Sequence, residues 1–467
     1  MKYNLFVFVH PFDSKDVNLN ILMQKYQEQT IFQEIRECKM SFVNYKWDEK
    51  MNKGLLFVLI PIVFSFLACQ NRNDDSKVVV CVPVYGQSLA LGEETQRITN
   101  LDSLNELYDY RIVGENLKND FGYYDCSPVK RKIKRVLKLS KRDFEVSVYG
   151  MAEALVNELG KDTMVCVFAG GQGATPINGI SKGTAPYVRF LNDIKNAKEI
   201  ADEKGMKFYV PAICWMQGES DMYDYTNVDY KQRLNQFCID INKDIKAITH
   251  QKQDIKIVSY QTNMLALCNE FCQNEYSLYE TSIPQAQMEL VRDNSFFVAG
   301  TPTYFLSFAR ERMHINAISQ KRVGYYNAES VISIIRNQKH RGLYPKKIIA
   351  EGTEVKVVLD VPCPPLVIDT IEVSKVDYYG FNIVTASNES IIKDIVVHGD
   401  TVLLKCSQLV KGAKVRYAVN GQKGKSGYLR GARGNLRDSQ GLVNAAIVQK
   451  KIYPMHNWCY QFDILVE

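Results

Sequence analysis

Residues 207–221 read KFYVPAICWMQGESD, a mostly apolar run that ends in a dense polar cluster. A run of this kind is typical of a strand buried on both faces of a sheet. Comparable runs stand at residues 78–84, 163–169, 255–260 and 296–299. Helical patterns separate or follow them, at residues 147–159, 187–201, 228–248, 284–291 and 317–335. Strands that alternate with helices predict an α/β fold, with a parallel sheet covered by helices on both faces.

The pattern changes after about Gly342, where the apolar segments become short, rich in β-branched residues and separated by turn residues. The segments are 355–359, 370–373, 382–385, 395–397, 401–404 and 415–419. They predict a smaller antiparallel, sandwich-like β domain at residues 341–467, after an α/β domain at residues 77–340. Gly424–Asp438 is rich in Gly and Arg, and we expect a flexible loop there, with packing against the first domain as the alternative.

The composition is that of an ordinary globular protein. The chain has 467 residues, 46% of them hydrophobic, and a formal net charge of +6. This excludes wholesale disorder, and the absence of long basic runs argues against nucleic-acid binding. Twelve Cys and six His form no CxxC pair or other zinc-like pattern, so we expect no metal. Cys268 and Cys272 are the only close cysteine pair, whereas Cys81, Cys166 and Cys214 lie in apolar runs and are expected to be buried thiols.

The N-terminal part needs a separate interpretation. Residues 54–68 form an apolar run that follows Lys53 and ends at Ala68-Cys69, in the layout of a secretory signal with a sequence similar to a bacterial lipobox. We expect translation from Met51, with residues 1–50 a start-site artefact, 51–68 a lipoprotein signal peptide and 69–76 a tether. The protein would then be exported and anchored to the membrane of the bacterial cell envelope through lipidated Cys69. The alternative is an anchoring helix with a cytoplasmic tail.

Polar residues that follow the strands are the candidates for chemistry, because ligands of parallel sheets bind at the carboxyl ends of strands. Ser88 follows the first strand, and Gly170 with Gly171 follows the second. The third strand is followed by Gln217, Glu219 and Asp221. Two carboxylates this close together are also compatible with an acid/base pair or with a metal site built from oxygen ligands, and both alternatives stay open. His314 follows the fifth strand, three residues after Glu311. A carboxylate at that spacing can orient the imidazole, which then takes a proton from a serine.

Taken in order, these blocks resemble the SGNH hydrolase superfamily. They are Gly86-Gln87-Ser88, Gly170-Gly171, Trp215-Met216-Gln217-Gly218-Glu219-Ser220-Asp221 and Glu311-x-x-His314. The sequence is similar to the sialate O-acetylesterase and acetylxylan esterase group, carbohydrate esterase family six, over residues 77–338. The resemblance implies a three-layer, flavodoxin-like fold without metal or cofactor. It also implies Ser88 as nucleophile, His314 as base and Glu311 as its orienting carboxylate. The oxyanion hole would consist of the N–H groups of Ser88 and Gly171 and the side chain of Gln217, with Gly170, Glu219 and Asp221 as substrate-binding or supporting residues.

Three positions depart from the family pattern: Glu311 stands where Asp is usual, Leu89 where Asn is usual, and Gln172 where Thr or Ser is usual. The resemblance implies a serine O-acetylesterase that removes acetyl groups from glycans such as acetylated sialic acids, so an acetylated carbohydrate is the expected partner. The alternative is a surface glycan-binding lipoprotein with a degenerate esterase fold that turns nothing over. Leu89 and Glu311 are the features in favour of that alternative.

Overall fold

The computed structural model describes residues 77–108, 111–113, 144–223, 229–263, 282–384, 390–410 and 412–466. The chain divides into two units, Met1–Asp75 and Ser76–Glu467, and every described residue belongs to the second. The expected signal peptide, Cys69, the tether and the Cys268/Cys272 pair therefore lie outside the described residues. Among the described helices, none is both long enough and apolar enough to span a membrane.

The first half of the described chain forms parallel sheets. One has the order β3-β4-β1-β6, and the other has the order β5-β2-β7-β8-β9. The strands of the first are Ile112–Val113, Thr163–Cys166, Val78–Cys81 and Lys207–Tyr209. The strands of the second are Ala169–Gly171, Val84–Gly86, Ala212–Met216, Lys256–Gln261 and Phe297–Pro302. All pairings within both sheets are parallel, which confirms the predicted α/β class.

Three of the expected strands are each split in two, and their halves belong to different sheets. The run 78–84 becomes β1 and β2, 163–169 contributes to β4 and β5, and 207–215 contributes to β6 and β7. Pro83 and Pro211 lie at two of the breaks, where the missing N–H interrupts the ladder. Hydrogen bonds from Val82 N to Cys166 O, 2.8 Å, and from Val84 N to Phe168 O, 2.9 Å, continue across the break.

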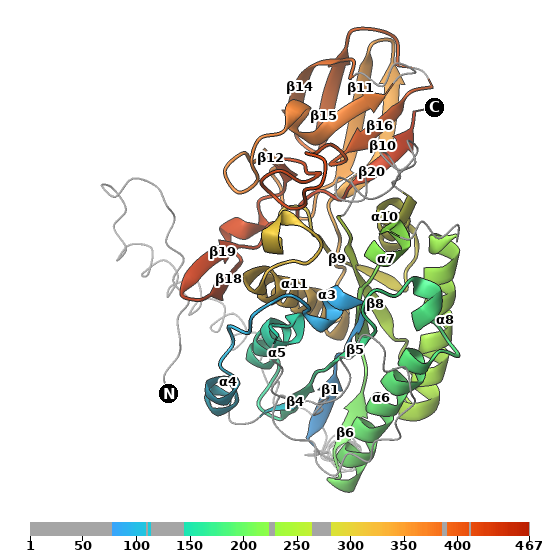
Figure 1. The fold of residues 1–467 in the computed structure, drawn as a ribbon, viewed down its shortest axis with the longest axis vertical. Coiled ribbons are helices and arrows are strands. Elements are labelled where there is room, and N and C mark those ends of the chain that lie inside the picture. The colour runs from blue at the N-terminus through green and yellow to red at the C-terminus, as the bar shows by residue number, and fades with distance from the viewer. Residues whose placement is uncertain are drawn as a thin grey trace, which may run out of the picture. The chain divides into compact units, whose positions relative to one another are not determined.

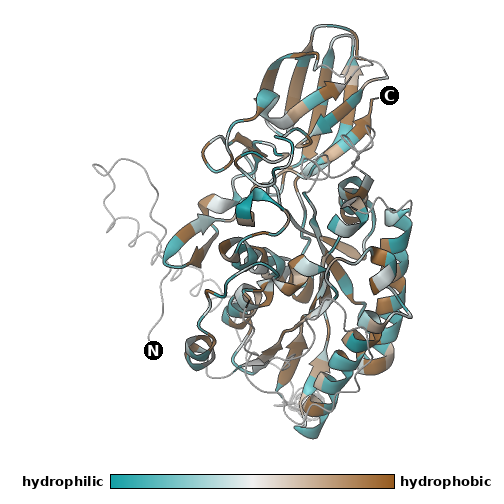
Figure 2. Ribbon diagram, in the orientation of Figure 1, coloured by the Kyte–Doolittle hydropathy of each residue, from teal (hydrophilic) through white to brown (hydrophobic). Residues whose placement is uncertain are grey.

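Helices cover both faces of these strands (Figure 1), with α6 and α8 along one side and α5 and α11 along the other. The helices are α3 (Ser88–Leu91), α4 (Leu101–Leu107), α5 (Ser147–Glu158), α6 (Ala185–Glu203), α7 (Glu219–Tyr223), α8 (Tyr230–Thr249), α10 (Ser282–Asp293) and α11 (Ala317–Ile335). Figure 2 shows apolar residues along the central strands, whereas α6 and α8 carry both apolar and hydrophilic residues. This is the pattern of a helix with one face on the core.

Capping side chains define where the two long flanking helices begin. The Asp229 carboxylate accepts a hydrogen bond from Gln232 N, 2.9 Å, at the start of α8. The Asn316 side chain accepts one from Ser319 N, 2.9 Å, at the start of α11. Each satisfies a backbone donor that the first helical turn leaves without a partner. The cap of α11 fixes the chain two residues after His314, one of the expected catalytic residues.

The second half is antiparallel, as predicted. One sheet has the order β10-β11-β15-β14 and another the order β13-β16-β20, and two pairs, β12-β17 and β18-β19, complete it. Their bounds are β10 (Tyr344–Glu351), β11 (Glu354–Asp360), β12 (Val367–Ile368), β13 (Phe381–Val384), β14 (Ile392–His398), β15 (Thr401–Cys406), β16 (Lys414–Tyr417), β17 (Leu436–Arg437), β18 (Ala445–Val448), β19 (Lys451–Pro454) and β20 (Phe462–Leu465).

One expected strand is wrong. Residues 370–373 form a bend and a turn, and the nearby strand is β12, at Val367–Ile368. The cause is the buried Asp369 side chain, which accepts hydrogen bonds from Ile371 N and Glu372 N, both 2.8 Å. An Asp side chain that accepts hydrogen bonds from the backbone N–H groups two and three residues ahead favours a turn. The β-branched residues in this segment had suggested an extended strand.

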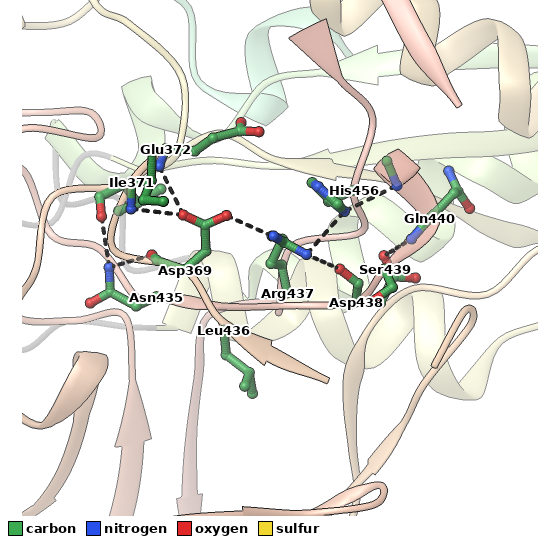
Figure 3. A network of polar contacts seen from close by, with 12 residues as sticks. Asp369, Ile371, Glu372, Asn435, Leu436, Arg437, Asp438, Ser439, Gln440 and His456 are labelled. Atoms are coloured by element: carbon green, nitrogen blue, oxygen red, sulfur yellow. Dashed lines mark hydrogen bonds and ion pairs between the residues drawn. The ribbon is translucent and has the colours of Figure 1, made fainter. Parts of the chain in front are cut away.

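Asp369 belongs to a buried polar network in this C-terminal half (Figure 3). Arg437 Nε donates to Asp369, 2.7 Å, and Arg437 Nη1 donates to Asp438 O, 2.9 Å. His456 Nδ1 accepts from Gly441 N, 3.0 Å, and burial lowers the pKa of His456 to about 4, so the imidazole is neutral. Gln440 Nε2 reaches Glu329 in α11, 2.7 Å. The network therefore connects the β half to a helix of the α/β half.

Candidate active site

Ser88 is the first residue of α3 and comes two residues after the end of β2. The end of β2 is crowded, since Gly86 pairs with Gly171 on one side and with Met216 on the other. A Cβ at Gly86 would lie 1.9 Å from Met216 O, so no side chain fits there. Glycine thus allows the tight passage from strand to helix, which places the buried Ser88 at the carboxyl edge of the sheet.

Gly170 and Gly171 lie in β5, the edge strand beside β2. Gly171 has a φ of 116°, and a Cβ there would lie 1.8 Å from Gly86 O. A Cβ at Gly170 would lie 2.8 Å from the Phe190 ring. Gln172 N donates to Gly86 O, 3.0 Å. The structure therefore brings the expected backbone donors of Ser88 and Gly171 to the same strand end, because only glycine permits this approach.

Gln87, which the sequence analysis did not single out, connects the serine to the third block. Its side-chain Oε1 accepts hydrogen bonds from Ser220 N, 3.1 Å, and Gly218 N, 3.4 Å. Its backbone N–H donates to Met216 O, 3.1 Å. These three contacts fix the residue before Ser88 against the loop that carries Gln217. In the sequence, the position of Gln87 inside the block Gly86-Gln87-Ser88 was the signal that could have drawn attention to it. Its hydrogen-bond partners could be identified only from the fold.

Gln217 is fully buried, and its amide group is engaged by protein groups. Its Nε2 donates to Thr175 O, 3.3 Å, and to the Asp221 carboxylate. Its Oε1 accepts from the Tyr230 hydroxyl, 2.9 Å. A primary amide has two N–H groups, so both have acceptors here. The resemblance implies that Gln217 contributes to an oxyanion hole. In that role, the N–H group that makes the longer hydrogen bond, to Thr175 O, would leave it and donate to the oxyanion.

Glu219 and Asp221 are both buried, and each serves a different set of donors. Asp221 accepts from Ile177 N, 2.8 Å, in addition to Gln217. Glu219 accepts from the Tyr260 hydroxyl and from Thr262 Oγ1, 2.6 Å. Burial raises the pKa of Glu219, while its hydrogen bonds with Thr262 and Tyr260 act in the opposite direction. Asp221 thus holds the Gln217 side chain, whereas Glu219 is held by Tyr260 and Thr262, so these hydrogen bonds place the two carboxylates in separate surroundings.

His314 follows a short 3₁₀ turn, Ala309–Glu311, and is 6% exposed. Its Nδ1 lies 2.9 Å from Glu94 Oε2, and its Nε2 is buried without a hydrogen-bond partner. Gln320 Nε2, from α11, donates to Leu89 O, 2.7 Å, which ties the helix after His314 to the helix that begins at Ser88. Within the described part of the chain, no hydrogen bond joins Ser88 to His314, whose Nε2 has no partner. Contacts between a serine and its base often tighten only when substrate binds.

Glu311 differs from the expectation. Its carboxylate forms an ion pair with Arg430, with Nε 2.9 Å from Oε1, and this hydrogen bond lowers the pKa of Glu311. Arg310 and Glu311 both have positive φ, 55° and 53°, and this tight turn directs Glu311 toward the Gly/Arg loop. Glu94 takes the place beside His314 Nδ1 instead. The two residues are 220 positions apart in sequence, so no local spacing could have indicated this pair.

The Gly/Arg loop, expected to be flexible, contacts the segment before His314. Ser426 N donates to Glu311 O, 2.9 Å, and Tyr428 N donates to Leu306 O, 3.2 Å. Gly427 has a φ of 84°, and a Cβ there would lie 2.7 Å from Leu306 O. The alternative given in the sequence analysis, packing against the first domain, therefore describes the loop. No group of three or more His, Cys, Asp or Glu suited to a metal occurs among the described residues.

Comparisons with known proteins agree with this fold. Residues 131–333 match the family described as carbohydrate esterase, sialic acid-specific acetylesterase. No curated protein sequence matches the chain. A carbohydrate acetylesterase from Xanthomonas citri is similar in structure, with a TM-score of 0.54 and 13% identity over 82% of this chain and 80% of that one. This likeness concerns the fold.

Two further structures match over a smaller part of this chain. A protein from Arabidopsis thaliana has a TM-score of 0.37 and 15% identity over 55% of this chain and 98% of that one. The protein NanS has a TM-score of 0.37 and 13% identity over 56% of this chain and 99% of that one.

Proposed function

We propose that this chain, whose residues 131–333 match the carbohydrate esterase family of sialic acid-specific acetylesterases, is a serine O-acetylesterase that acts through Ser88 and His314. The observation that carries the proposal is the state of the His314 ring. Glu94 engages Nδ1, whereas Nε2 is buried and has no hydrogen-bond partner. A general base that activates a serine has one ring nitrogen held by a carboxylate and the other free to accept the serine proton, and the His314 ring has this arrangement.

In the proposed reaction, Ser88 Oγ attacks the carbonyl carbon of an acetyl ester while His314 Nε2 accepts the hydroxyl proton. The N–H groups of Ser88 and Gly171 stabilise the oxyanion, with Gln217 as the third donor once it releases Thr175 O. The C–O bond to the sugar then breaks, and the departing alkoxide takes the proton from His314. Water, deprotonated by His314, attacks the acetyl-enzyme. The bond from the acetyl carbon to Ser88 Oγ breaks, Oγ takes the proton back from His314, and acetate leaves.

The proposal includes the partners expected from the sequence. The substrate is an acetylated carbohydrate, and the membrane is reached through the lipidated Cys69. The apolar run at residues 54–68, followed by Ala68-Cys69, supports export and anchoring at the bacterial cell envelope. No cofactor takes part, because every step uses a side chain or a backbone N–H group of this chain.

The test is hydrolysis of an aryl acetate and an acetylated sugar by the purified protein, with Ser88→Ala as the variant. We expect kcat/KM to fall by about 10³-fold or more, as on loss of other serine nucleophiles. Ser103→Ala, an exposed serine on α4, is the matched control and should keep wild-type activity. Turnover that survives Ser88→Ala contradicts the proposal. Glycan binding without turnover, in wild type and variant alike, selects the glycan-binding alternative.

A further inference from the structure

Glu93 is a carboxylate near the proposed active site that the mechanism above does not use. It follows Gly92, the residue in left-handed conformation that ends α3, and its backbone N–H donates to Ser88 O, 3.1 Å. This hydrogen bond places Glu93 one turn after the nucleophile. The residue therefore starts from the same edge of the sheet as Ser88.

The Glu93 carboxylate lies against the loop that follows β5. A Cβ at Gly173 would lie 2.4 Å from Glu93 Oε1 and 3.3 Å from Oε2, so both oxygens pack over the bare glycine. Gly173 is two residues after Gly171, the expected oxyanion donor. Burial raises the pKa of the Glu93 carboxyl, and the electrostatic influence of His314 acts in the opposite direction. The carboxylate thus stands within reach of both the oxyanion loop and the base.

Unlike Glu94 and Glu219, the Glu93 carboxylate receives no hydrogen bond from the residues that the structure describes. Glu219 accepts from Tyr260 and Thr262, and Glu94 pairs with His314. Partial burial is the main influence on Glu93 and raises the pKa of its carboxyl, with Glu94 adding to the effect. A partly desolvated acceptor without a donor is stabilised by any hydroxyl group brought to it. Arg430 does not fill this role, since Glu311 already binds it.

We propose that Glu93 is a substrate-binding residue that accepts hydrogen bonds from the free hydroxyl groups beside the acetylated position of a neutral sugar. The proposal rests on the esterase function proposed above. A negative carboxylate at this place repels a second carboxylate, so sugars that carry one, such as acetylated sialic acids, bind less well than neutral acetylated sugars. Glu93 thereby determines the substrate class, and it takes no part in bond breaking.

The experiment measures kcat/KM of the full chain on three esters: an aryl acetate without a sugar, a mono-O-acetylated neutral hexose and a mono-O-acetylated sialic acid. Wild type is compared with Glu93→Gln, which keeps one acceptor oxygen and loses the charge, and with Glu93→Ala. Glu203→Gln, an exposed glutamate at the end of α6, is the matched control. A pH profile is recorded for each variant, since a change in the base would shift it.

We expect wild type to favour the neutral hexose ester over the sialic acid ester. Glu93→Gln should reduce that preference by about tenfold, and Glu93→Ala should lose more on the hexose ester than on the aryl acetate. The Glu203→Gln control should keep the wild-type preference. Because Gln retains an acceptor, its loss on the hexose ester should be smaller than that of Ala.

Two outcomes overturn the assignment of Glu93 alone. Wild type that hydrolyses all three esters but prefers the sialic acid ester, or has no preference, contradicts a selective carboxylate. Equal losses of Glu93→Gln on all three esters, with a shifted pH profile, show that Glu93 acts through His314. Wild type that hydrolyses none of the esters overturns the proposed esterase function itself, and the Glu93 role with it.

Discussion

Glu94 and Glu311 show, at the scale of single residues, that the sequence alone could not identify the carboxylate beside His314. The sequence pattern places Glu311 three residues before His314, and its type and spacing suit an orienting carboxylate. In the structure Glu311 pairs with Arg430, and Glu94 lies beside His314 Nδ1. Local spacing indicated His314 as the candidate base, whereas the carboxylate beside it depends on which distant segments meet in the fold. Ser88 and Gly171 could be named as candidates because each follows an apolar run that is typical of a strand.

We therefore predict different effects for the two carboxylates. Glu94→Gln should lower kcat by about tenfold with a smaller change in KM, because it removes the charge that orients and stabilises the His314 imidazolium. The loss should be smaller than for a buried triad carboxylate, since the Glu94 side chain is 60% exposed. The measurement is steady-state kinetics on an aryl acetate over a range of pH.

Glu311→Gln is the comparison for this prediction. Its carboxylate contacts Arg430 and not the base, so its effect on kcat should be the weaker of the two. A larger loss in Glu311→Gln than in Glu94→Gln would contradict the assignment. It would mean that Glu311 turns back to His314 in the working enzyme, as the family resemblance implies.

At the scale of elements, most strands and long helices of the first half followed from apolar runs and helical periodicity, and the predicted range 317–335 coincides with α11. Helix α4 and strand β3 were not predicted. The breaks within the strands were not predicted. They depend on where Pro83 and Pro211 interrupt the backbone hydrogen bonds between strands that are distant in the sequence. The Gly/Arg loop was the least accessible element. Its composition suggests flexibility, but Ser426 and Tyr428 donate backbone hydrogen bonds to the segment before His314.

The loop prediction concerns Gly427→Ala. The new Cβ would lie 2.7 Å from Leu306 O, in a backbone with φ of 84° that disfavours L side chains. We expect the loop to separate from the 306–311 turn, with a loss of about 1–3 kcal/mol in stability and a several-fold fall in kcat. Thermal unfolding and turnover of an aryl acetate measure the two effects.

Gly183→Ala is the matched control for the loop prediction. Gly183 has a φ of 91°, and nothing lies within 4 Å of its Cβ position. It therefore carries a comparable backbone strain without a clash and without contact to His314. Equal losses of kcat in the two variants would show that the contact between loop and turn has no part in activity.

At the scale of the whole molecule, sequence predicted the order of an α/β half and an antiparallel half, but not how polar groups join them. The buried network of Figure 3 brings Asp369, Arg437 and His456 together from three separate segments. Pairs this far apart leave no periodic signal in a single sequence. The network continues through Gln440 to Glu329 in α11, so the two halves share a partly buried, titratable contact.

Glu329 makes the stability of the molecule depend on pH. Burial, with a contribution from the charge of Asp438, raises its pKa to about 7 in the folded protein. In the unfolded chain a glutamate titrates near 4.3. Between these two values the folded state binds more protons than the unfolded state, so the free energy of unfolding falls as pH rises through that interval. The cost of ionising Glu329 is then fully present above about pH 7 and absent below about pH 4.

Glu329→Gln removes this ionisation and keeps an oxygen that can accept from Gln440 Nε2. We expect it to stabilise the protein near pH 8 by about 2 kcal/mol, a rise in Tm of roughly 2–4 °C, and to have little effect near pH 4. Thermal unfolding of wild type and variant at both pH values measures the difference, with Glu203→Gln as the exposed control. A variant less stable than wild type at both values would mean that the carboxylate stabilises the contact between the two halves when ionised. An equal gain in stability at both pH values would mean that the substitution acts through packing and not through the charge of Glu329.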